Sequence, residues 1–344
     1  RLGGREVEAS VGVQVRSDFI TNGLFRDARR MRLQTVRRDR IDETSFGLWV
    51  EGKAQLHDKL RATAGARVDH YLFDVHSDNP ANSGNDRATL FSPRAGIAFG
   101  PFASTELYLN GGFGFHSNDA RGVTSRDDPA TPAPLDGMRV TPLVRARGAE
   151  LGLRTTALAG LQSTVSLWYL DSDSELIFVG DAGNTQASRA SERWGIEFAN
   201  HYQPCRWLLL DADAAVSRAL FQDQDPAGRH VPNAVGLTAN AGITLLGAHG
   251  FASLRMRHFG RRSLIEDDSV RSSATTLFNL RLGCALSGAT NLSLDVLNLF
   301  DAKDQDIAYS YTSRLAGEPA SGVDDVHFHP VEPFMLRLTF EARF

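Results

Sequence analysis

Hydrophobic and polar residues alternate along much of this chain, and the last segment shows the pattern most clearly. From residue 334 to residue 344 every second residue is apolar, and most of the residues between them are polar or charged. The apolar set is Phe334, Leu336, Leu338, Phe340, Ala342 and Phe344. Because successive side chains of a strand point to opposite faces, this segment is predicted to be a strand with one apolar face and one polar face.

The same alternation recurs from residue 5 onward, and it predicts an all-β protein with about 14 strands. Tight turns join the strands in pairs, and long polar loops separate the pairs. The expected strands cover residues 5–16, 42–56, 60–74, 90–100, 105–116, 144–155, 161–171, 193–202, 207–220, 233–246, 251–259, 276–286, 291–300 and 334–344.

Strict alternation of short and long connections is typical of an antiparallel up-and-down transmembrane β-barrel, with short periplasmic turns and long outer loops. A soluble β-sandwich is the alternative. A sandwich does not predict this alternation of connections. Its strands usually have about 5–6 residues, far fewer than the strands expected here.

Long polar segments at residues 17–40, 117–141, 171–191 and 301–332 are predicted to lie between the expected strands. Residues 17–40 are rich in Arg and lack periodicity, so we expect a basic outer loop. The part from Arg26 to Arg40 would attract an anionic ligand or lipopolysaccharide phosphates, although simple solvation is the more common role of such a loop. Residues 301–332 form the last long loop, and Leu176–Val179 extend a strand above the membrane.

The composition agrees with a membrane barrel and excludes other classes. The 344 residues carry a net charge of −4, so the chain lacks the excess of basic residues that is typical of nucleic-acid-binding proteins. No run of 18 apolar residues exists, whereas a barrel strand needs only alternate apolar residues over about 10 positions. The two cysteines, Cys205 and Cys284, are expected to be unpaired, with one disulfide as the alternative.

Catalytic and metal-binding motifs are not recognisable. There is no Gly-x-Ser-x-Gly, His-Glu-x-x-His or Walker loop, so we predict neither an enzyme nor a cofactor. Gly111–Gly114 is expected to be part of a strand. His327 and His329 share one parity beside Asp324 and Asp325 and would suit a metal, but a solvated loop is the more frequent interpretation.

Three stretches resemble the barrel of TonB-dependent outer-membrane receptors. The family has Ser-Pro-Lys/Arg-x-Gly, then Glu-Leu-Tyr, then Gly-x-Gly-Phe-x-Ser, and this chain has Ser92–Gly96, Glu106–Tyr108 and Gly112–Ser117. Glu150–Thr155 is similar to the family's Glu-x-Gly-Leu-Lys-Thr strand. Val296–Asp301, together with the terminal Phe344, resembles the family's Asn-Leu-Phe-Asp segment and closing strand.

The resemblance implies a receptor of the bacterial outer membrane that takes up a scarce bulky solute, such as a ferric siderophore. Family members have a plug domain, a TonB-binding segment and 22 strands. Residues 1–344 are therefore expected to be the last part of such a barrel without the plug, with a processed or truncated start at Arg1. TonB would act only through the missing plug region.

Other partners and a ligand site also follow from the resemblance. We expect outer-membrane lipid and lipopolysaccharide around the barrel, and a barrel-assembly machinery that reads Phe344. Aromatic and Arg side chains where strands enter the outer loops line the ligand site in the family. In this chain the residues at such positions are His116, Arg121, Tyr309, Tyr311 and Arg314.

Two alternatives remain open. One is a passive 14-strand channel, in which the first strand closes on the last. The other is an outer-membrane enzyme, which would need a Ser/His pair or a carboxylate cluster converging at the outer rim.

Overall fold

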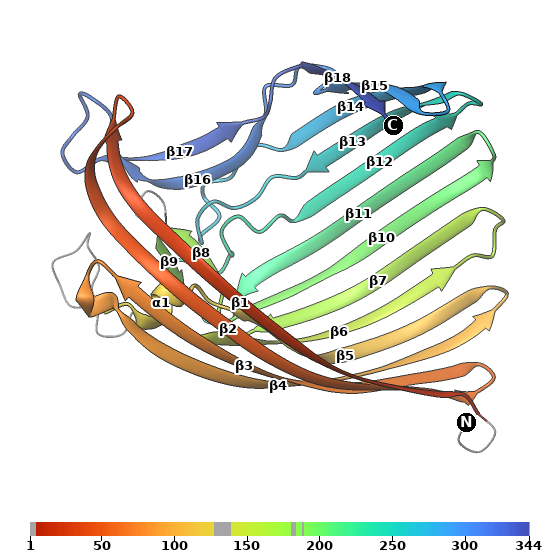
Figure 1. Ribbon diagram of the computed structural model, residues 1–344, viewed down its shortest axis with the longest axis horizontal. Helices are drawn as coiled ribbons and strands as arrows, with labels where there is room; N and C mark the ends of the chain where they lie inside the picture. The colour runs from red at the N-terminus through yellow and green to blue at the C-terminus, as the bar shows by residue number, and fades with distance from the viewer. Residues whose placement is uncertain (1–4, 127–138, 180–183, 188, 344) are drawn as a thin grey trace. The chain divides into compact units, whose positions relative to one another are not determined.

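Fourteen strands form one antiparallel sheet in which each strand pairs with its neighbours in up-and-down order (Figure 1). The computed structural model describes residues 5–126, 139–179, 184–187 and 189–343. The strands are β1 (Val7–Ala28), β2 (Met31–His57), β3 (Leu60–Ser77), β4 (Gly84–Phe102), β5 (Thr105–Ser117), β6 (Leu143–Thr155), β7 (Leu161–Ser172), β10 (Ser191–Cys205), β11 (Leu208–Phe221), β12 (Leu237–Leu246), β13 (Gly250–Phe259), β14 (Thr275–Ser287), β15 (Thr290–Leu297) and β18 (Met335–Ala342).

This order confirms the predicted all-β, up-and-down architecture. The sheet is not closed, because β1 and β18 are its two edges. Two hairpins stand apart as separate two-stranded sheets: β8 (Leu176–Val179) with β9 (Asn184–Ala187), and β16 (Gln305–Ser313) with β17 (Val323–Pro330). Residues 176–179 were expected to extend a strand of the main sheet, and they pair with β9 instead.

The chain packs as two compact units. Unit 1 comprises Arg1–Ala98, Leu109–Ala149 and Leu170–Ser191, and unit 2 comprises Phe99–Tyr108, Glu150–Tyr169 and Glu192–Phe344. No helix among the described residues has the length and apolar character needed to cross a membrane.

One face of the sheet in unit 1 is apolar and exposed. Val13 lies opposite Leu48 in the β1–β2 pair, and these side chains are 79% and 55% exposed. Asp69, on the other face of β3, is 2% exposed. A protein in water rarely exposes so many large apolar side chains along a single face, whereas a barrel in lipid has such a band.

The predicted basic loop at residues 17–40 is wrong, because β1 and β2 continue through it to a tight turn. Arg29 and Arg30 form that turn with φ values of 49° and 64°. The register shifts between Leu24 and Phe25 and again between Arg26 and Asp27. Each bulge changes which side chains share a face, so strict alternation is lost although the strands persist.

The long loops predicted at residues 117–141 and 301–332 are partly ordered structure. The second contains the β16–β17 hairpin, and the first contains helix α1 (Ala120–Thr124). A buried apolar cluster fixes α1 against β2, β3 and β6. The cluster consists of Ile41, Phe73, Val75, Ala120 and Leu143.

Polar contacts add to this anchoring of α1. Asn82, which is 1% exposed, ends the short 3₁₀ helix η1 (Pro80–Asn82). Its carbonyl accepts a hydrogen bond from the Thr124 hydroxyl at 2.9 Å, and its side-chain oxygen accepts one from the Arg126 amide at 2.9 Å. The loop that contains α1 is thereby tied to the β3–β4 connection.

Both cysteines are free, which confirms the prediction that they are unpaired. Cys205 is half-buried and Cys284 is exposed.

Truncating the cluster beneath α1 will loosen this loop. Phe73 is 1% exposed, so we expect Phe73→Ala to cost about 3–5 kcal/mol of local stability. Hydrogen exchange of residues 119–125 will measure this as lost protection. Leu72→Ala is the matched control, because the Leu72 side chain is exposed on the opposite face. Equal exchange in the two variants would contradict the packing described above.

Candidate functional site

The polar face of unit 1 carries paired charges. Arg67 Nε donates to both carboxylate oxygens of Asp69, at 2.8 and 2.7 Å, and Nη2 donates to Gln14 Oε1 at 3.1 Å. Gly47 lies beneath this guanidinium, and a Cβ there would come within 2.2 Å of Arg67 Nη2. A glycine at this position therefore leaves the space in which Arg67 lies against the strand.

A pocket of about 410 Å³ opens beside these charges. Arg94 forms an ion pair with Glu51 within it. The lining residues are Trp49, Val50, Glu51, Ala66, Arg67, Ser92, Arg94, Phe113, Gly114 and Phe115. The pocket combines two guanidinium groups, one carboxylate and aromatic rings, a set that suits a polar ligand with a flat apolar part.

The polar face of unit 2 also carries paired polar and charged side chains. Tyr108 donates to Glu150 at 2.9 Å, and Arg255 makes two hydrogen bonds with Asp211, at 3.0 and 3.2 Å. Asp295 accepts from Arg337 at 3.1 Å and is paired with Arg281 at 3.4 Å. Because the arginines in these pairs are more than half exposed, each pair adds little stability. Their effect is to fix charged groups on a face exposed to water.

Two of the predicted ligand residues, His116 and Arg121, lie in unit 1. The Nε2 atom of His116 is buried and has no hydrogen-bond partner among the described residues. Arg121 lies in α1, and its Nε donates to the two oxygens of Asp119 at 3.0 and 3.1 Å. Asp119 also caps the helix by accepting from the Arg121 amide at 2.9 Å. Arg121 thus has a structural partner, which a ligand would have to displace.

The electrostatics of this pair stabilise the charged forms. Burial by itself would raise the pKa of the Asp119 carboxyl, but the hydrogen bonds from Arg121 outweigh burial and leave that pKa below its usual range. Hydrogen bonding to Asp119 likewise raises the pKa of Arg121. A second buried ion pair contributes to the same field, with Arg37 Nε 2.6 Å from Asp39 Oδ2.

The other predicted residues lie on the β16–β17 hairpin of unit 2. Tyr309 is directly opposite His327. Tyr311 stacks on His327 with ring centroids 4.0 Å apart and an interplanar angle of 15°. Arg314 follows β16, and its Nε donates to the Glu318 carbonyl at 3.2 Å. The hairpin therefore brings Tyr309 and Tyr311 together on one face, and a loop carbonyl holds Arg314.

His327 was not predicted as a ligand-contacting residue. In the sequence, His327 and His329 stand at alternate positions of one segment, and this spacing suggested a metal site instead of a ligand contact. Within the described part of the chain no three potential metal-ligating side chains gather. Asp324 accepts from the Thr312 hydroxyl, and Asp325 accepts from the Val326 amide at 2.7 Å. Phe344, the predicted assembly signal, lies outside the described residues.

The Asp119–Arg121 pair predicts a pH dependence of the α1 loop. Because the folded pKa of Asp119 lies below its unfolded value of about 3.9, its stabilisation is present above that value and is lost as the pH falls through the folded pKa. Hydrogen exchange of residues 119–125, corrected for intrinsic rates, will show protection falling below about pH 4.

Asp119→Asn will show reduced protection already at neutral pH and little further change on acidification. Asp78→Asn, at an exposed residue of the neighbouring connection, is the control and will behave as the wild type. An acid response that survives in Asp119→Asn would contradict the assignment.

Comparison with known proteins gives a consistent result. The sequence profile described as TonB dependent receptor-like, beta-barrel matches residues 2–299. No curated protein matches. Among solved structures, the ferric-catecholate import receptor Fiu from E. coli K12 has a TM-score of 0.75 at 15% identity, covering 100% of this chain and 53% of that one.

Two further structures show the same fold. The ferric yersiniabactin uptake receptor FyuA from Yersinia pestis has a TM-score of 0.71 at 15% identity, covering 98% of this chain and 51% of that one. The copper transporter OprC has a TM-score of 0.71 at 17% identity, covering 98% and 55%. This chain spans about half the length of these proteins. The profile match extends over most of the 344 residues, and the chain therefore belongs to the family of TonB-dependent receptor-like β-barrels.

Proposed function

We propose that this chain is part of a bacterial outer-membrane receptor for TonB-dependent uptake of a scarce metal chelate, such as a ferric siderophore. The observation that carries the proposal is the combination of two features. One is the polar face with fixed Arg and carboxylate groups, and the other is the aromatic face of the β16–β17 hairpin. Chelates of this kind are bulky, polar and often aromatic, so they would bind both to charged groups and to aromatic rings.

The hairpin suits the first contact with such a solute. Tyr309, Tyr311 and His327 offer flat rings with polar tips, which bind planar groups while keeping hydrogen-bonding capacity. The similar structures support the class of cargo by their own names, which specify ferric catecholate, ferric yersiniabactin and copper. Energy coupling is assigned to TonB acting through a plug region outside these 344 residues.

A passive 14-strand channel is the second candidate, and the two sheet edges disfavour it. β1 has 22 residues and β18 has 8. Direct closure of β18 on β1 would leave more than half of β1 without a partner strand, and a long unpaired edge is costly. The family is one of transport receptors, so an outer-membrane enzyme has no support from it.

Uptake by the full-length protein tests the proposal. Cells that express it will accumulate at least one radiolabelled chelate from a panel of ferric catecholates, ferric phenolates, ferric citrate and copper complexes. Accumulation will stop when TonB is deleted. Accumulation that continues without TonB would favour the passive channel, and failure with every chelate would contradict the cargo class.

Removal of the stacked tyrosine will weaken binding of the accepted chelate. We expect Tyr311→Ala to raise the Kd by roughly 10–30-fold, the loss expected for a buried aromatic contact. Calorimetry on the purified full-length protein will measure it. Thr312→Ala is the control, since residue 312 projects from the opposite face of the same strand. Equal affinities of the two variants would remove the hairpin from the ligand site.

A further inference from the structure

The short helix α1 lies on the polar face of unit 1. Phe73 has the same parity as Asp69 of the polar face, and no register shift interrupts β3 between these two residues. Phe73 belongs to the apolar cluster that also contains Ala120 of α1. We call residues 118–126, together with residues 139–142, the α1 strap. The strap therefore covers part of the face that carries the paired charges.

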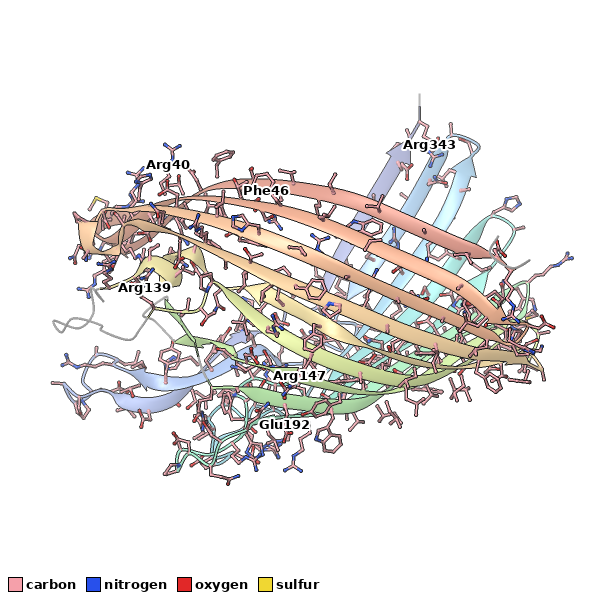
Figure 2. The ribbon with its side chains drawn as sticks, turned by 90° about the horizontal axis from the view of Figure 1, so that it is seen from below. Arg40, Phe46, Arg139, Arg147, Glu192 and Arg343 are labelled. Atoms are coloured by element: carbon pink, nitrogen blue, oxygen red, sulfur yellow. The ribbon has the colours of Figure 1, made fainter. Side chains whose placement is uncertain are left out.

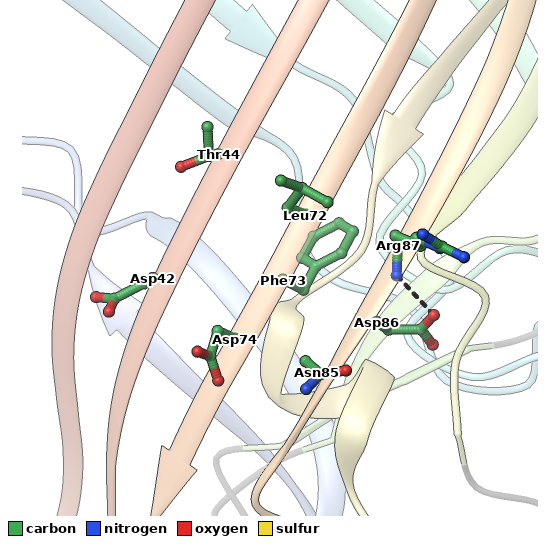
Figure 3. Close-up of a pocket in the computed structure, with 8 residues that line it drawn as sticks. All are labelled: Asp42, Thr44, Leu72, Phe73, Asp74, Asn85, Asp86 and Arg87. Atoms are coloured by element: carbon green, nitrogen blue, oxygen red, sulfur yellow. Dashed lines mark hydrogen bonds between the residues drawn. The ribbon is translucent and has the colours of Figure 1, made fainter.

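Asn82 and Arg139 fix the strap to the wall of unit 1. Asn82, in the β3–β4 connection, accepts two hydrogen bonds from the carboxyl end of α1, as described above. Arg139, labelled in Figure 2, donates from Nε to the Val123 carbonyl at 2.8 Å and from Nη2 to Asp86 of β4 at 3.2 Å. Asp86 in turn accepts a hydrogen bond from the Arg87 amide at 2.7 Å, within the pocket that Figure 3 shows. The strap is thus bonded both to the β3–β4 connection and to β4.

The strap is packed like a protein core, not like a lid. Val123 and Ala120 of the strap are 0% and 4% exposed, and Phe73 of the wall is 1% exposed. The Asn118 amide donates to the Pro142 carbonyl at 2.9 Å, which joins the two parts of the strap. Segments that open have few buried apolar contacts, and lifting this strap would transfer its apolar side chains to water. We therefore expect the strap to keep one position.

Phe115 connects the strap to the pocket of about 410 Å³ described above. Phe115 packs against the apolar cluster beneath α1, and its ring meets the Tyr71 ring edge-on, with centroids 5.8 Å apart and an interplanar angle of 87°. Tyr71 in turn stacks on Phe73, with 5.9 Å between the ring centroids. Phe115 lines the pocket together with Arg94 and Trp49. The strap therefore supports one aromatic wall of a pocket that also contains guanidinium groups.

We propose that the α1 strap is a fixed wall of the solute pathway. It stays on the polar face during uptake, and its contact with Phe115 shapes the pocket for the flat part of the chelate. Asn82 and Arg139 are positioning residues, because they act on the solute only through the strap and Phe115. This inference rests on the proposed function, which supplies the chelate, and it adds a second contact region to that of the β16–β17 hairpin.

A disulfide between the strap and β4 tests whether the strap moves. A Cβ on Gly84 would lie 3.8 Å from the Thr124 Cβ, within the roughly 3.5–4.5 Å that a disulfide requires. Gly84→Cys/Thr124→Cys is built in the full-length protein after Cys205 and Cys284 are replaced by Ser. Uptake of radiolabelled ferric catecholate, or of whichever panel chelate the wild type accepts, will be the same with the disulfide oxidised or reduced. Uptake that is lost on oxidation and restored by a reductant would overturn the proposal, because it would show that the strap opens.

Loosening the strap tests its effect on the pocket. Asn82→Ala removes a side-chain acceptor of the strap, and we expect it to raise the Kd of the accepted chelate roughly 10-fold. The oxidised disulfide to β4 will restore the affinity of this variant. Gly122→Cys/Val140→Cys is the matched control, because a Cβ on Gly122 would lie 3.9 Å from the Val140 Cβ. This second disulfide ties the strap only to itself, so it will not restore the affinity.

A second pair of variants removes the other anchor. Arg139→Gln will raise the Kd in the same direction as Asn82→Ala, because it breaks the bonds to the Val123 carbonyl and to Asp86. Arg87→Gln is its control, since it removes a neighbouring guanidinium but keeps the backbone bond to Asp86. This control will bind the chelate as the wild type does. Heat-modifiable migration on gels will verify that all the variants are folded.

Hydrogen exchange of residues 119–125 is measured without any chelate. Asn82→Ala will lower the protection of these residues, and the oxidised disulfide to β4 will restore it. This result decides the anchoring even when the wild type binds no chelate of the panel, which would count against the proposed function instead. Unchanged protection in Asn82→Ala would contradict the anchoring, and lower protection with unchanged affinity would remove the strap from the pocket.

Discussion

Backbone hydrogen bonding between neighbouring strands is the constraint on which the rest of this structure depends. In hydrocarbon every N–H and C=O needs a partner within the protein, so the chain pairs each strand with the next in long antiparallel ladders. The register of each ladder then decides which side chains meet lipid. A slip of β1 by one residue in the Val13–Leu48 pairing would transfer the polar and charged side chains of β1 to the apolar face.

The two faces of the sheet carry different chemical groups. The polar face holds charges in place with partners such as the buried Asp69 for Arg67, which is one-third exposed. On the apolar face of β2, the exposed side chains change along the strand from Leu48 and Phe46 to Arg40 and Arg38.

Alternation in the sequence was sufficient to predict the strands that contact one apolar and one polar environment. It failed for residues 17–40, because bulges shift the faces and because the buried positions of β2 in this stretch hold the Arg37–Asp39 ion pair instead of apolar side chains. The site was predictable only by location. Tyr309 and Tyr311 do share a face, but the stacking of His327 depends on cross-strand register. The role of Arg121 depends on its distance from Asp119 in a folded helix.

Spin labels placed one by one at residues 44–54 of β2 would test the two-faced sheet most directly. Cys205 and Cys284 are first replaced by Ser, and the full-length protein is inserted in lipid. Labels at 46, 48 and 50 will collide mainly with oxygen, which dissolves in lipid, and labels at 47, 49 and 51 will collide less with it. Oxygen accessibility without this period of two would contradict the assignment of the apolar face to lipid.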